Sequence, residues 1–227
     1  MSGLTMLIVA SVAFVGTHFL MSHPLRAAMV GALGEKGFAG AYTIVSLLTF
    51  GWMIWAYPAA SAEAPQPLWD AGRWGFVVAT LLMWLGSVLF VGSLRRNPAL
   101  PRPGKVIERI DDPIGVYAIT RHPMMWGFAL WAVVHAIVNP TAASLVLSAT
   151  IAFLALVGAA LQDEKKARLM GDLWRDWRSK TSFVPYGRGL KSADGFALIS
   201  GTILWLVATW AHGALGYRPA GVWAFFA

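Results

Sequence analysis

Two histidines lie inside apolar stretches of the sequence, where an ionisable side chain is costly. His18 belongs to the apolar stretch at the N-terminus, and His135 lies in a later stretch, well away from both of its ends. Neutral imidazole is the commonest metal ligand in proteins and also binds haem iron. His135 is therefore a candidate ligand for a metal or a haem, although a hydrogen bond to a neighbouring helix would also satisfy a buried imidazole.

A second group of polar residues lies at the ends of apolar stretches. Arg121 and His122 come directly before one of them, and Asp163 and Glu164 follow the next. Acidic residues at the C-terminal end of a helix oppose its dipole, so we expect a partner such as Arg121, or a ligand, for this acidic pair. His23 and His212 also lie near the ends of apolar stretches, and the sequence assigns them no role.

The elements that position these residues are predicted to be membrane-spanning helices. Of the 227 residues, 57% are hydrophobic and 13% are charged, about half the charged share of a soluble domain. A bilayer core requires about 20 apolar helical residues. Six segments approach that length: residues 3–22, 38–57, 72–94, 123–139, 141–161 and 195–212. We predict an all-α, polytopic membrane helical bundle of about six transmembrane helices that forms a single domain over residues 1–227.

The basic residues predict how these helices are oriented. All but two of the 18 Lys and Arg residues fall in the connections after the first, third and fifth segments, and the exceptions are Arg73 and Arg218. Basic loops remain in the cytoplasm. The pattern therefore predicts a membrane protein with both termini on the non-cytoplasmic side.

Two of the predicted cytoplasmic loops are long, covering about residues 95–121 and 163–194. Within the second, residues 163–178 are predicted as one charged amphipathic helix on the membrane face. Its apolar side would hold Leu169, Leu173, Trp174 and Trp177.

Several classes of function lack their sequence signatures. The chain has no Cys, which excludes disulfides and thiolate metal sites. It contains no Walker-type loop, dinucleotide fingerprint, HExxH or GxSxG motif. Its basic loops lack the interleaved aromatic residues of a nucleic-acid site, so we expect membrane lipid and lipid-soluble small molecules as partners, and no nucleic acid.

The predicted depths of His18 and His135 allow one iron to bind both. His18 would lie about 6–15 Å from the cytoplasmic end of its helix, and His135 about 18 Å from the cytoplasmic end of its own. The depths nearly meet if the first helix continues past Pro24 or if the helices tilt differently. The spacing thus permits a haem with two histidine ligands without demanding one.

Two stretches of the sequence resemble the NnrU family of membrane proteins. The first runs from His18-Phe-Leu-Met-Ser22 to Tyr42-Thr-Ile-Val-Ser46. The second contains Thr120-Arg121-His122-Pro123, Trp126-Gly127, Leu130-Trp131-Ala132 and His135, and continues through Asp163-Glu164 to Thr181-Ser-Phe-Val-Pro185. The chain departs from the family pattern after Asn139, where Pro140-Thr141 replaces an acidic residue, and at His212-Gly213, which replaces a His-Pro-like ending.

The resemblance implies a location in the bacterial inner membrane, which would place both termini in the periplasm, and it also implies a cofactor and a field of function. The family is named for a link to nitric oxide and nitrite metabolism, and it is similar to the plant 15-cis-zeta-carotene isomerase, which uses haem b. By that similarity His135 and His18 are the expected haem ligands, either of which could be the labile one during catalysis, and His122 matches the histidine of the Arg-His-Pro motif. The expected activity is cis-trans isomerisation of a lipid-soluble polyene, or a role related to nitric oxide.

Two alternatives remain open. Isoprenylcysteine carboxyl methyltransferases share the Arg-His-Pro turn and a later acidic pair followed by Gly and two aromatic residues, which here are Gly171, Trp174 and Trp177. That similarity implies an S-adenosylmethionine pocket in which Arg121 and His122 orient the cofactor. A non-enzymatic membrane assembly or transport factor is the other alternative, and it would require none of these residues.

Overall fold

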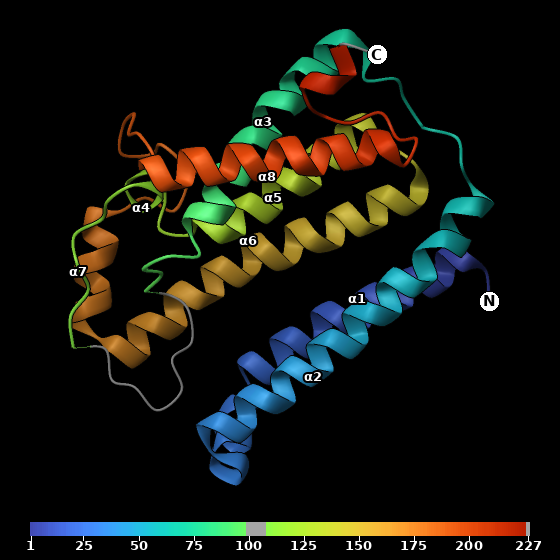
Figure 1. Ribbon diagram of the computed structural model, residues 1–227. Coiled ribbons are helices and arrows are strands. Elements are labelled where there is room, and N and C mark those ends of the chain that lie inside the picture. The colour runs from blue at the N-terminus through green and yellow to red at the C-terminus, as the bar shows by residue number, and fades with distance from the viewer. Residues whose placement is uncertain (99–107, 226–227) are drawn as a thin grey trace. The chain divides into compact units, whose positions relative to one another are not determined.

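Helices make up the regular structure of the part of the chain that the computed structural model describes, residues 1–98 and 108–225. In chain order they are α1 (Gly3–Ser22), α2 (Arg26–Glu63), α3 (Gly72–Gly92), α4 (Val116–Ile119), α5 (Pro123–Val138), α6 (Ala142–Met170), α7 (Asp172–Lys180) and α8 (Gly195–Ala214), followed by the short 3-10 helix η1 (Val222–Phe225) (Figure 1). The predicted all-α fold is therefore confirmed. Part of the predicted loop 95–121 lies outside the described residues.

Five of the helices, α1, α2, α3, α6 and α8, are long and apolar enough to cross a membrane. The sixth predicted segment is α5, an apolar helix of 16 residues, which is about 24 Å long. This set of helices fits the predicted helical membrane bundle. The predicted bounds of α1 are correct, but α2 and α6 extend beyond the predicted apolar segments. Gly34 separates residues 26–33 from the rest of α2, because its φ of 70° and ψ of 169° are not helical and the chain is kinked there. The polar sequence at the end of α6 continues that helix beyond its apolar part, as helix-forming residues allow.

The chain divides into two compact units, and the first contains residues 1–68 and 139–150. Here α1 and α2 form a helical hairpin (Figure 1). The Glu63 carboxylate at the end of α2 accepts hydrogen bonds from the backbone N–H groups of Gly3 and Leu4, the latter at 3.0 Å. A carboxylate at this position satisfies unpaired N–H groups and complements the dipole of α1. It therefore joins the two open ends of the hairpin.

The second unit contains residues 69–98, 108–138 and 151–225 of the described chain, and in it both α5 and α8 pack against α3 (Figure 1). Glycines allow these close contacts. A Cβ atom on Gly127 of α5 would lie 2.9 Å from the Cβ of Phe90, and one on Gly201 of α8 would lie 2.5 Å from the Cα of Val88. Small residues commonly mediate such close approach between membrane helices.

The predicted single amphipathic helix over residues 163–178 is wrong. The chain continues α6 to Met170, breaks at Gly171 with a φ of 55°, and begins α7 at Asp172. A positive φ at this ψ suits glycine and strains other residues. The sequence shows a glycine there, but a glycine inside a helical pattern does not by itself specify a break.

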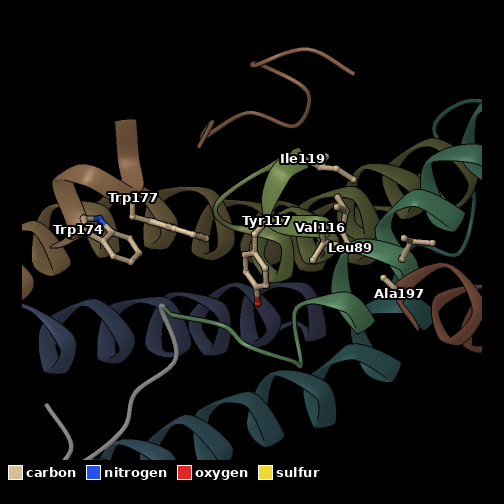
Figure 2. Packing of buried hydrophobic residues seen from close by; sticks show 8 residues of the cluster. Leu89, Val116, Tyr117, Ile119, Trp174, Trp177 and Ala197 are labelled. Atoms are coloured by element: carbon tan, nitrogen blue, oxygen red, sulfur yellow. The ribbon is translucent and has the colours of Figure 1, made fainter. Parts of the chain in front are cut away.

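The two tryptophans of α7 are core residues. Trp174 and Trp177 are buried in a cluster with Leu89, Val116, Tyr117, Ile119 and Ala197. Figure 2 shows both indoles projecting from α7 toward Tyr117, whose ring centroid lies 6.1 Å from that of Trp177. The apolar side of α7 thus covers protein, and the prediction that this segment exposes these side chains to the membrane is wrong.

Candidate functional site

The turn before α5 places Arg121 and His122 side by side. Thr120 is extended, with a φ of −155° and a ψ of 149°, and Pro123 opens α5, a position where proline is favoured because it lacks an N–H. The carbonyl of His122 accepts the first helical hydrogen bond, from the N–H of Trp126 at 3.0 Å. The Arg-His-Pro motif is therefore the start of the helix that also carries His135.

Asp163 binds both of these side chains. Nε and Nη2 of Arg121 donate to Oδ2 of Asp163 at 2.7 and 2.5 Å, and Nε2 of His122 lies 2.8 Å from Oδ1. The three side chains are only 10%, 1% and 4% exposed, respectively. The expected partner of the acidic residues, Arg121, is thus confirmed for Asp163. Glu164 instead lies 3.5 Å from Arg178, at a more exposed position.

The segment after α7 completes this cluster. The backbone N–H of Arg121 donates to the carbonyl of Ser182 at 2.8 Å, and the Thr120 hydroxyl donates to the carbonyl of Phe183 at 2.6 Å. The Trp126 indole donates to the same Phe183 carbonyl at 2.8 Å. The Phe183 ring lies beneath the Arg121 guanidinium, 5.4 Å from its centre. The motifs around residues 121, 163 and 183 are therefore one structural group.

Burial and complete pairing determine what this cluster can do. A guanidinium stays charged in proteins, and a buried charge requires an ionised partner. Here the Asp163 carboxylate neutralises the charge of Arg121 and is hydrogen-bonded to Nε2 of His122. Both side chains therefore have a partner within the protein. The arrangement suits holding the α4–α5 turn, the end of α6 and the segment after α7 in fixed register.

His18 is held by its own helix in the first unit. Its Nδ1 lies 2.8 Å from the carbonyl of Phe14. A carbonyl only accepts, so Nδ1 carries the proton and Nε2 retains its lone pair. The imidazole lies among aromatic rings, with the Phe14 ring centroid at 4.5 Å and that of Tyr42 at 5.3 Å.

His135, in the second unit, has the same local arrangement. Its Nδ1 lies 2.8 Å from the carbonyl of Trp131, and the two rings are stacked with centroids 4.0 Å apart and planes inclined by 31°. Nε2 of His135 is therefore also free to accept. Metal-binding histidines typically donate their other ring N–H to a carbonyl or carboxylate in this way.

His212, to which the sequence assigns no role, lies beside His135. The two ring centroids lie 6.3 Å apart. Its sequence signals were its position near the end of the last apolar segment and its match to the His-Pro-like ending of the family pattern, and neither reveals a partner on another helix. Over residues 1–98 and 108–225, the structure contains no group of three or more His, Cys, Asp or Glu side chains able to hold a metal ion.

Comparison with known proteins identifies the family. The model of the NnrU family, described as NnrU protein, matches residues 6–219. The chain belongs to the NnrU family. The match covers nearly the whole chain of this NnrU protein and includes His18, the cluster of Arg121, His122 and Asp163, His135 and His212. Searches of curated proteins and of solved structures found no match.

Proposed function

We propose that this NnrU-family protein binds haem b between transmembrane helices of the bacterial inner membrane. It would act in nitric-oxide- or nitrite-related metabolism, or in cis-trans isomerisation of a lipid-soluble polyene. The observation that carries the proposal is the state of two imidazoles in apolar helices. Each donates Nδ1–H to the carbonyl four residues earlier, which leaves Nε2 of His18 and of His135 free for iron.

The donor set fits haem iron. Neutral imidazole nitrogen is its usual proximal ligand, and an N–H anchored to a carbonyl fixes the ring orientation and increases the basicity of the ligand. The surrounding aromatic rings, Phe14 and Tyr42 near His18 and Trp131 near His135, offer apolar surface for a flat macrocycle. When bound, haem b would supply an iron whose redox state and coordination control binding of a small ligand or a double bond.

The chain's own residues would have distinct tasks. His18 and His135 would bind the iron, and the Trp131 ring would hold the His135 imidazole in place. The cluster of Arg121, His122 and Asp163 would position α5, the helix that carries His135, from its N-terminal end. In this proposal Arg121 and His122 support the cofactor site without contacting the reacting atoms.

A visible spectrum of the purified protein tests the proposal. Protein expressed with an ample haem supply and purified in mild detergent should show split α and β bands on reduction. The His135→Ala variant should lose them, whereas the control variant His23→Ala should retain them. Colourless protein from every form would overturn the proposal. Thermal protection of that colourless protein by S-adenosylmethionine would instead favour the methyltransferase alternative, and no protection would favour an assembly or transport factor.

A further inference from the structure

Two imidazoles from different helices meet near the ends of α5 and α8. The His135 and His212 rings have centroids 6.3 Å apart and planes inclined by 56°. His135 lies three residues before the end of α5, and His212 two residues before the end of α8. Both helices pack against α3 in the same compact unit, so the pairing is set by helix packing.

Hydrogen bonding leaves the same nitrogen free on both rings. Nδ1 of His212 lies 2.7 Å from the carbonyl of Ala208, just as Nδ1 of His135 lies 2.8 Å from that of Trp131. Since a carbonyl cannot donate, each Nδ1 carries a proton and each Nε2 presents a lone pair. Both rings thus have the tautomer and the backbone anchor that metal-binding imidazoles typically have.

The spacing matches two imidazoles on one metal. With metal–nitrogen bonds of about 2.0–2.1 Å, each ring centroid lies about 3.2 Å from the metal, so two centroids are separated by about 5.2 Å in a tetrahedral arrangement and about 6.4 Å when opposite. The observed 6.3 Å falls within that range, near the opposite arrangement.

The electrostatics of this location favour a cation. Unpaired carbonyls give the C-terminal end of a helix a partial negative charge, and both imidazoles belong to the last turn of their helices. His212 is exposed at the end of α8, so the pair can be reached from outside the protein, while stacking on Trp131 holds His135. Imidazole ligands suit iron, copper, nickel and zinc.

We propose that His135 and His212 are the two protein ligands of one transition-metal centre. The centre is either the iron of haem or a free divalent ion. In the first case the inference rests on the haem binding of the proposed function but replaces its ligand His18 with His212. In the second case His135 and His212 bind an ion without haem. The shared chemistry is coordination by two Nε2 atoms.

Copper binding tests the pair without haem. Haem-free protein, purified in detergent through a streptavidin-binding tag instead of a polyhistidine tag, should bind one Cu²⁺ with superhyperfine lines from two nitrogens in its electron paramagnetic resonance spectrum. His212→Ala and His135→Gln should each weaken binding at least tenfold, whereas His18→Ala and His23→Ala should not. His212 is exposed, so its truncation should leave the fold intact. Unchanged copper binding in His212→Ala would overturn the inference.

A haem titration shows whether the metal bound by His135 and His212 is haem iron or a free divalent ion. If the metal is haem iron, His212→Ala should convert a low-spin spectrum to a high-spin one, while His18→Ala stays low-spin. Conversion in His18→Ala alone, with copper binding also insensitive to His212, would overturn the inference and leave the haem proposal standing. If no form takes up haem, the proposed function fails, and the copper titration alone decides whether His135 and His212 form a site.

Discussion

At the scale of single residues, the strongest constraint is the buried carboxylate of Asp163. It accepts from the Arg121 guanidinium and contacts the His122 imidazole, and none of the three side chains is more than 10% exposed. A buried ion pair contributes little net stability compared with an apolar replacement, but removing one partner leaves a buried charge without compensation. The cluster therefore sets the arrangement of three chain segments, and disruption at one residue affects all of them.

We expect Asp163→Asn to destabilise the protein strongly. The amide cannot neutralise Arg121, and removing one partner of a buried pair costs about 3–5 kcal/mol. Thermal unfolding in detergent, followed by tryptophan fluorescence, should show a large decrease in Tm. The control is Asp176→Asn, whose carboxylate pairs with Lys180 at the exposed surface and should contribute little to stability because solvent screens the pair. Equal Tm values for the two variants would contradict the structural role of the cluster.

Tyr117 should ionise at unusually high pH. Burial raises the pKa of its phenol, which donates to the carbonyls of Ser93 and Arg95 at 3.0 and 3.1 Å. Because the folded state favours the neutral phenol, this stabilisation is complete below the unfolded pKa of about 10 and disappears as pH rises through the folded pKa. Ultraviolet titration of the five tyrosines should therefore show a late step to which Tyr117 contributes.

Two variants assign that step. Tyr117→Phe should reduce the amplitude of this step by one tyrosine and destabilise the protein by about 1–3 kcal/mol, since the buried carbonyl of Ser93 loses its donor. Tyr217→Phe, at a residue that is 66% exposed, should leave the step in place. A late step of unchanged amplitude in Tyr117→Phe would assign it to other tyrosines alone.

At the scale of helices, glycines with positive φ determine where the short helices α4 and α7 begin. Gly115 precedes α4 and Gly171 precedes α7, with nearly equal backbone angles of 58° and −130° and of 55° and −126°. Their surroundings differ. A Cβ atom on Gly115 would overlap the carboxylate of Asp194, which caps α8 by accepting from the N–H of Ala197 at 3.0 Å, whereas one on Gly171 would meet open space.

Because the backbone angles are nearly the same and only the surroundings differ, substitution of one glycine is a control for substitution of the other. Gly115→Ala and Gly171→Ala should share a backbone strain of about 1–3 kcal/mol, and Gly115→Ala should cost about 1 kcal/mol more because it displaces the cap of α8. Thermal unfolding of both variants measures the difference. In an Asp194→Ala background the excess should vanish, because the carboxylate is then absent. An excess that persists there would contradict the steric explanation.

At the scale of the whole molecule, the basic residues predict the orientation in the membrane. Almost all Lys and Arg fall in alternate stretches between the apolar segments, and such stretches remain in the cytoplasm. The two termini and the connection between α2 and α3 should then face the periplasm. The absence of native Cys makes this orientation directly testable by labelling of introduced thiols.

We expect opposite labelling of two single-cysteine variants in intact spheroplasts. A membrane-impermeant maleimide should label Gln66→Cys, in the exposed connection between α2 and α3, but should label Ser192→Cys, in the exposed connection before α8, only after lysis. Labelling of Ser192→Cys in intact spheroplasts would reverse the orientation. Resistance of both variants before lysis would contradict the periplasmic position of the α2–α3 connection.

The sequence alone determined the fold class, the number of apolar segments and the need for a partner at Asp163. These follow from local properties, because the length of an apolar run and the cost of a charge do not depend on what packs nearby. The same reasoning found His18 and His135, since an imidazole in an apolar helix is visible in the sequence.

Tertiary structure decided which residues meet. A membrane helix is apolar on the sides that face lipid and on the sides that face protein, so its pattern does not tell which face is buried. That is why His212 beside His135, Asp163 shared by Arg121 and His122, and the inward-facing tryptophans of α7 were not predicted. Each depends on close packing between segments distant in sequence, at contacts such as those of Gly127 and Gly201 with α3.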